Sequence, residues 1–128
     1  MSKHAQFIQS IETNSHHPAK AMRRLILATT TDNLWLYVLS LLVERDYFAY
    51  ELRGAVQERY GVAMASVTAY VLLYKLQRDG LVDLSDERRE GKRPTRKYYR
   101  ITENGRQSLA DAREYLQLLV QTLVNPPV

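Results

Sequence analysis

Apolar residues recur at helical spacing in three successive stretches of the chain. Between about Asn33 and Arg45 the apolar positions are separated by three and four residues, as on the buried face of an amphipathic helix. A second helix is expected over residues 49–60, with Gly61 at its C-terminal cap, and a third from Ser66, as N-cap, to Gly80. Three helices with a short turn between the last two predict a helix-turn-helix.

The period of the pattern changes after Gly80. Residues 81–86 and 97–101 alternate along the chain, and a loop with Gly91 and Pro94 separates them, so an antiparallel hairpin is expected. A last helix follows Thr102, and its apolar residues at steps of three and four form a seam typical of helices that pair: Leu109, Ala112, Leu116, Leu119 and Leu123. The predicted fold is mainly α with a small β-hairpin, a winged helix-turn-helix followed by a C-terminal dimerisation helix.

Three segments follow from this interpretation. Residues 1–31 form an N-terminal extension that is expected to be partly helical or disordered, with Pro18 suited to a first helical position. Residues 32–102 form the winged helix-turn-helix, whose first helix would be capped by side chains of Thr29–Asp32. Residues 103–128 form the dimerisation helix.

Positive charge is concentrated in the predicted hairpin, the wing. The 128 residues have a formal net charge of +4, yet residues 88–100 hold seven cations and one acid, so the remainder is slightly acidic. Cations on a hairpin beside an outward helix suit contact with DNA phosphates, which releases counterions and supplies affinity. The wing residues expected to make these contacts are Arg89, Lys92, Arg93, Arg96 and Lys97.

The third helix is expected to present a second set of contacts to DNA. Thr68, Val71 and Lys75 lie on the side away from the expected core and are candidates for the groove. Ser66 is equally well explained as a cap or as a DNA contact, and Tyr70 as a core residue whose hydroxyl reaches a phosphate. In the wing, Tyr99 is assigned to the core and Tyr98 is left open, because neighbours on a strand face opposite sides.

Several classes of function are not expected. The chain has no cysteine, and His4, His16 and His17 have no acidic partners at ligand spacing, so neither a metal nor another cofactor is predicted. There is no glycine-rich phosphate loop, nucleophile elbow or catalytic carboxylate pair, so an enzyme is not expected. No apolar run reaches the ~20 residues of a membrane span, and no secretory signal is recognised, so a cytoplasmic protein without membrane contact is expected.

Three stretches resemble the PadR-like family of transcriptional regulators: YEL at 50–52, TAYVLLYKLQRDGLV at 68–82 and GKRPTRKYYRITENGRQSL at 91–109. Ala49, Val67 and Val71 depart from the family's usual residues, which are glycine, glycine and proline. The resemblance implies a homodimeric repressor of the short-tailed type that binds double-stranded DNA. It also implies, for some members, a small apolar or aromatic effector near the dimer interface.

Two alternatives stay open at this point. Trp35 is expected in the core or the dimer interface, and a ligand contact by stacking is the less favoured interpretation. A winged-helix module that uses its basic wing to bind an acidic protein is the alternative function. The salt dependence of binding to random duplex DNA would separate this module from a DNA-binding regulator.

Overall fold

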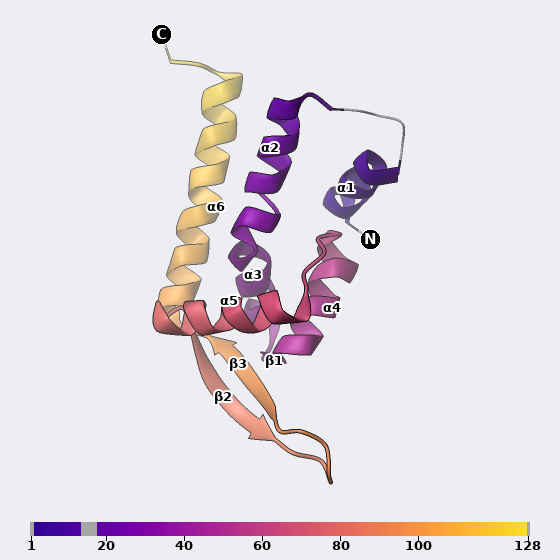
Figure 1. Ribbon diagram of the computed structural model, residues 1–128. Coiled ribbons are helices and arrows are strands. Elements are labelled where there is room, and N and C mark those ends of the chain that lie inside the picture. Colours follow the sequence, from indigo (N-terminus) through magenta and orange to yellow (C-terminus); the bar gives the residue numbers. More distant parts are fainter. Residues whose placement is uncertain (1, 14–17, 128) are drawn as a thin grey trace.

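The computed structural model describes residues 2–13 and 18–127, so His16 and His17 lie outside the described part. Helices α3, α4 and α5 surround one centre, the β2–β3 hairpin extends to one side, and α2 and α6 project side by side to the other (Figure 1). The elements in chain order are α1 (Lys3–Thr13), α2 (Lys20–Ala28), a 3-10 turn η1 (Thr31–Asn33), α3 (Trp35–Glu44), β1 (Tyr47–Phe48), α4 (Ala49–Tyr60), α5 (Ser66–Arg78), β2 (Val82–Arg88), β3 (Arg96–Ile101) and α6 (Glu103–Val124).

One hydrophobic core joins the three central helices to the sheet and to the start of α6. Leu39 and Leu41 of α3 and Leu52 of α4 are fully buried in it, together with Leu73 of α5 and Val82 of β2. The apolar stripes predicted these helices because burying such a face removes it from water. The predicted fold, a winged helix-turn-helix with a long C-terminal helix, is confirmed.

The sheet has three strands in the order β1-β3-β2, all antiparallel. The sequence predicts the hairpin but not β1. A strand of only two residues shows no alternation of apolar and polar positions, and β1 pairs with a segment that is distant in the sequence. Tyr47 lies opposite Tyr99, and Phe48 lies opposite Tyr98. A bulge between Leu84 and Asp86 interrupts the expected alternation of β2.

Of two predicted helix caps, one differs in the structure and one is confirmed. The hydroxyls of Thr29 and Thr30 donate to the carbonyls of Leu25 and Ile26, so they close the end of α2 and do not cap α3. A threonine hydroxyl can donate as well as accept, and here both hydroxyls donate to carbonyls in the last turn of α2. By contrast, Gly61 has a φ of 71° and ends α4 in the left-handed conformation, as predicted.

The N-terminal extension contributes a helix that packs on the end of α4. The Ser2 hydroxyl donates to the carbonyl of Arg59 at 3.0 Å, and a ring nitrogen of His4 lies 3.1 Å from the carbonyl of Tyr60. Ala5 is fully buried next to Gly61, where a side chain on the glycine would collide with it. Helix α1 therefore covers the turn that precedes α5.

Gly105 gives a stability prediction, because α6 crosses the backbone of Leu81 at this residue. A Cβ there would lie 2.2 Å from the Leu81 carbonyl oxygen and 2.7 Å from Cγ1 of Ile101. We expect Gly105→Ala to lower the free energy of unfolding, measured in urea, by about 3 kcal/mol. The clash is with backbone atoms, which cannot move aside as the end of a flexible side chain can. Gly54→Ala is the control: nothing lies within 4 Å of its Cβ, and alanine in a helix should raise stability by about 0.5–1 kcal/mol. Equal unfolding midpoints for the two variants would contradict the close packing at Gly105.

No single helix in the described part of the chain is both long and apolar enough to cross a membrane. The segments 20–33 and 35–44 meet the length and composition criteria only when taken as a pair, and they are bent by 51° at the break between them.

Candidate nucleic-acid interface

Helix α5 turns one side to the core and the other to solvent. Ala69, Leu73 and Leu76 are buried, and the candidates Thr68, Val71 and Lys75 are exposed. Because these two sets lie on opposite sides of the helix, the outward surface can enter a groove without disturbing the core.

Two assignments on α5 need correction. Tyr70 was expected mainly in the core, but it is 59% exposed, because the core side of the helix is centred on Ala69 and Leu73. Ser66 was a candidate N-cap, but the cap residue is Ala65, and no side chain bonds to the first turn. Ser66 is instead the first helical residue and is half-buried.

The structure divides the seven cations of the wing into two in ion pairs, four that are exposed and unpaired, and Arg96. Arg88 binds Asp86 at 2.7 Å, and Arg100 lies 4.0 Å from Asp83 across the strands. The Arg88 hydrogen bond lowers the pKa of the Asp86 carboxyl, with a smaller contribution from the backbone N–H of Glu87. Four cations are exposed and take part in none of the ion pairs formed within residues 2–13 and 18–127: Arg89, Lys92, Arg93 and Lys97.

Arg96 differs from these four because it packs on an aromatic pair at the base of the wing. The rings of Phe48 and Tyr98 meet edge to face with centroids 5.3 Å apart. The guanidinium of Arg96 lies 4.8 Å from the Phe48 centroid, and that of Arg88 lies 4.3 Å from the Tyr98 centroid. These contacts fix the hairpin against β1 and give Tyr98, left open by the sequence, a structural place.

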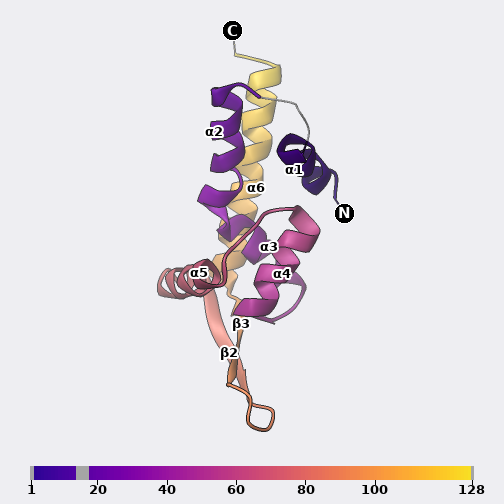
Figure 2. The same ribbon diagram turned by 45° about the vertical axis from the view of Figure 1, so that its right-hand side comes forward.

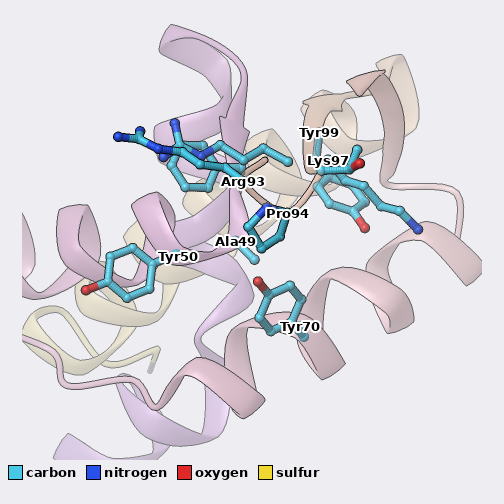
Figure 3. Close-up of a pocket in the computed structure, with 10 residues that line it drawn as sticks. Ala49, Tyr50, Tyr70, Arg93, Pro94, Lys97 and Tyr99 are labelled. Atoms are coloured by element: carbon cyan, nitrogen blue, oxygen red, sulfur yellow. The ribbon is translucent and has the colours of Figure 1, made fainter. Parts of the chain in front are cut away.

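A groove of about 490 Å³ separates the wing from the two helices beneath it. Arg93, Pro94 and Lys97 line it from the wing, and Ala49 and Tyr70 line it from α4 and α5. In Figure 3 the Tyr70 side chain points from α5 toward Pro94 and Ala49. The groove is therefore bordered by the unpaired Arg93 and Lys97 on one side and by the exposed Tyr70 of α5 on the other.

Tyr99 also lines this groove and packs against the core, as expected. Burial raises the pKa of its hydroxyl, and nearby Tyr70 and Glu87 raise it further. The hydroxyl is therefore neutral near pH 7 and keeps its proton for donation.

Three exposed residues beside this surface were not among the sequence candidates: Tyr50, Val67 and Tyr74. Each tyrosine carries an arginine of its own helix at 5.8 Å from the ring centroid, Arg53 over Tyr50 and Arg78 over Tyr74. A tyrosine with an arginine three or four residues later is visible in the sequence, and it could have drawn attention to both pairs.

Trp35 is half-buried at the start of α3, and its indole N–H donates to the side-chain oxygen of Asn33 at 3.0 Å. It lines a second groove of about 290 Å³ together with Val67, Val71 and Lys75 of α5. Trp35, for which a ligand contact was the less favoured interpretation, and the outward side of α5 thus border one depression.

The seam on α6 passes from the core into solvent. Leu109 is only 2% exposed within a single chain, so its side chain is covered by the chain's own core and offers no surface to a partner. Ala112 and Leu116 are half-buried, while Leu119 and Leu123 are 36% and 72% exposed. Figure 2 shows this end of α6 beside α2, on the side of the core away from the wing.

No group of three or more His, Cys, Asp or Glu side chains in the described residues could hold a metal ion.

Comparison with known proteins relates this arrangement to a family. The chain matches a PadR-family transcriptional regulator from Eggerthella lenta with a TM-score of 0.68 and 25% identity, over 84% of this chain and 95% of that one. For a PadR-like regulator from Bacillus cereus the TM-score is 0.61 at 22% identity, over 74% and 91% of the chains. For Bacillus subtilis PadR in complex with operator DNA, the TM-score is 0.56 at 25% identity, and the match covers 61% of this chain and 46% of that one.

No curated protein sequence matches the chain. Residues 38–111, more than half of the sequence, match the model of the transcriptional regulator PadR-like family. A match to a family of transcriptional regulators also agrees with the expectation that the chain is not an enzyme. The chain therefore belongs to the PadR-like family of transcriptional regulators.

Proposed function

We propose that the chain is a homodimeric repressor that binds an operator in double-stranded DNA. The observation that carries this proposal is the groove lined by Arg93 and Lys97 of the wing and by Tyr70 of α5. A helix about 10–12 Å across fits the ~12 Å major groove, so α5 enters it while the wing lies on the flanking phosphates. Bacillus subtilis PadR, a similar protein, is known in complex with operator DNA.

The charge of the wing supports phosphate contact over a solvated hairpin tip. Arg89, Lys92, Arg93 and Lys97 are exposed and form none of the ion pairs of the described residues, so no protein partner has to be displaced. Arginine and lysine in this state exchange bound water and counterions for phosphate oxygens. Arg96 contributes in a different way, because its contact with the Phe48 ring holds the wing in place.

Dimerisation is proposed because the projecting helices leave apolar side chains uncovered. Leu119, Leu123 and Val124 of α6 are exposed, and no residue of α2 is buried although Leu25 and Leu27 lie on it. Exposed apolar surface of this extent marks an interaction site, and α6 carries the heptad seam of a self-pairing helix. Two copies joined there place two α5 helices on half-sites about one helical turn, ~34 Å, apart. Repression follows from occupation of the promoter.

An effector is also part of the proposal, with Trp35 as its contact. The groove at Trp35 is bordered by Val71 and Lys75, so an apolar molecule bound there lies against the surface that α5 presents to DNA. Such a molecule would lower the affinity for the operator by covering this surface.

Selection of bound duplexes from a random pool tests the proposal. We expect a palindromic consensus whose half-sites are centred about 10 base pairs apart, since a two-fold dimer reads the same sequence twice. Failure to enrich any duplex at low salt would contradict DNA binding and favour the basic wing as a site for an acidic protein. Enrichment of a single, non-palindromic half-site would contradict the dimer.

A further inference from the structure

The outward side of α5 carries an apolar pair near the start of the helix. Val67 is 74% exposed and Val71 is 46% exposed, and a spacing of four residues places them one turn apart on the same side. Neither residue belongs to the core or packs against it as a partly buried neighbour. The first half of the outward side of α5 therefore presents two side chains without hydrogen-bonding atoms, and the exposed Tyr74 follows them one turn later.

The surroundings of the two valines identify what covers them. Lys75 and Arg78 are exposed on the same helix, and Arg93 and Lys97 of the wing line the neighbouring groove at Tyr70, while Asp32 lines the groove on the Trp35 side of the valines. An apolar pair with cations further along its helix and in the wing complements the edge of base pairs between two phosphate backbones. It matches an apolar protein surface less well, because the cations would lose water without gaining an anion.

The major groove offers one apolar group, the C5-methyl of thymine. A valine placed against guanine, cytosine or adenine would remove water from donors and acceptors and give nothing in return. We infer that Val67 and Val71 read thymine methyl groups, so the operator half-site carries thymines under α5. The inference rests on the proposed function, since it names which bases the DNA-binding surface selects.

The geometry of the helix restricts where these thymines lie. Four residues advance about 6 Å along an α-helix, and successive bases on a strand are about 3.4 Å apart. Val67 and Val71 therefore contact methyl groups within about two base-pair steps of each other. Each half-site has one such pair, and the two-fold symmetry repeats it.

Removal of single methyl groups from the DNA tests the inference. In the duplex selected from the random pool, each thymine is replaced in turn by deoxyuridine, which differs only by the C5-methyl. The affinity of the unchanged protein, Val67→Ala and Val71→Ala is measured for every duplex. We expect deoxyuridine to weaken binding by the unchanged protein about fourfold at two positions of each half-site, the effect of one buried methyl. Val67→Ala should lose this sensitivity at one of the two positions and Val71→Ala at the other.

Val43→Ala is the matched control, because Val43 is also an exposed valine of a helix but lies in α3. It should leave every affinity unchanged. The three valines are exposed, so the variants should keep the melting temperature of the unchanged protein, which checks that each one is folded.

The outcomes separate this inference from the proposed function. If the duplex binds but no deoxyuridine has an effect, or if both variants keep the full effect, the valines do not read thymine although DNA binding stands. Selection of no duplex at all would remove the proposed function itself. An apolar ligand or protein that binds the unchanged chain but not Val67→Ala, without competition from the duplex, would assign this patch to that partner and overturn the inference.

Discussion

Reversal of two wing charges, with Arg93→Glu and Lys97→Glu combined, is expected to weaken operator binding by a factor of about 100 or more. Both cations are exposed, neither forms an ion pair in the described part of the chain, and both line the groove beside α5. Each lost phosphate contact removes a charge-assisted hydrogen bond, worth about 1.5–3 kcal/mol, and adds repulsion. In a plot of log affinity against log salt, the slope should become shallower by about two, one for each phosphate contact.

Lys3→Glu combined with Lys20→Glu is the control for net charge. Both lysines are exposed at the start of helices α1 and α2, away from the wing (Figure 1). This variant has the same formal charge as the wing variant but should keep most of the affinity and the full salt slope. If the two variants lost affinity equally, the overall charge and not the wing would govern binding.

Leu119→Asp combined with Leu123→Asp should convert the dimer to monomers. These leucines are exposed in the single chain, so the change spares the core, unlike substitution of the buried Leu109. An aspartate pair opposed by its symmetry mates adds charge repulsion to lost apolar burial. The mass in sedimentation should fall by half, and affinity for the palindrome should fall by about 10²–10⁴, since the second half-site no longer binds in the same complex.

Gln117→Asp combined with Gln121→Asp provides the matched control on the same helix. Both glutamines are exposed and lie away from the seam of Leu116, Leu119 and Leu123. A dimer is expected for this variant. If the leucine variant kept the dimer mass as well, the projecting part of α6 would not form the interface.

The sequence predicted the central helices well because burial imposes a pattern on them. The apolar residues of 49–60 led to bounds identical to those of α4, and Gly61 marked its end. The prediction that Tyr70 lies mainly in the core was wrong. The pattern of large apolar residues leaves out the small Ala69, which lies at the centre of the buried side of α5. A tyrosine at the edge of a stripe is equally compatible with the core and with solvent.

The charge of the wing was also visible in the sequence, but the roles of its arginines were not. Arg88 and Arg96 become cross-strand neighbours only through the register of β2 and β3, and this register depends on a bulge that no periodicity reveals. The aromatic partner of Arg96, Phe48, belongs to β1, whose two residues pair with a strand about fifty residues away. Long-range pairing of short segments leaves no local signal, so the division into structural and unpaired cations had to come from the structure.

Cleavage of DNA from single tethered sites tests most directly whether α5 and the wing face the operator. The chain has no cysteine, so Ala65→Cys, Thr95→Cys and Asn125→Cys each provide one attachment site for an iron chelate, at the start of α5, in the wing and beyond α6. We expect the probe at residue 65 to cut within both half-sites, and the probe at residue 95 to cut symmetrically in the flanking DNA. The probe at residue 125 should not cut. If the probe at residue 125 cut the DNA and the probes at residues 65 and 95 did not, another face of the molecule would bind DNA.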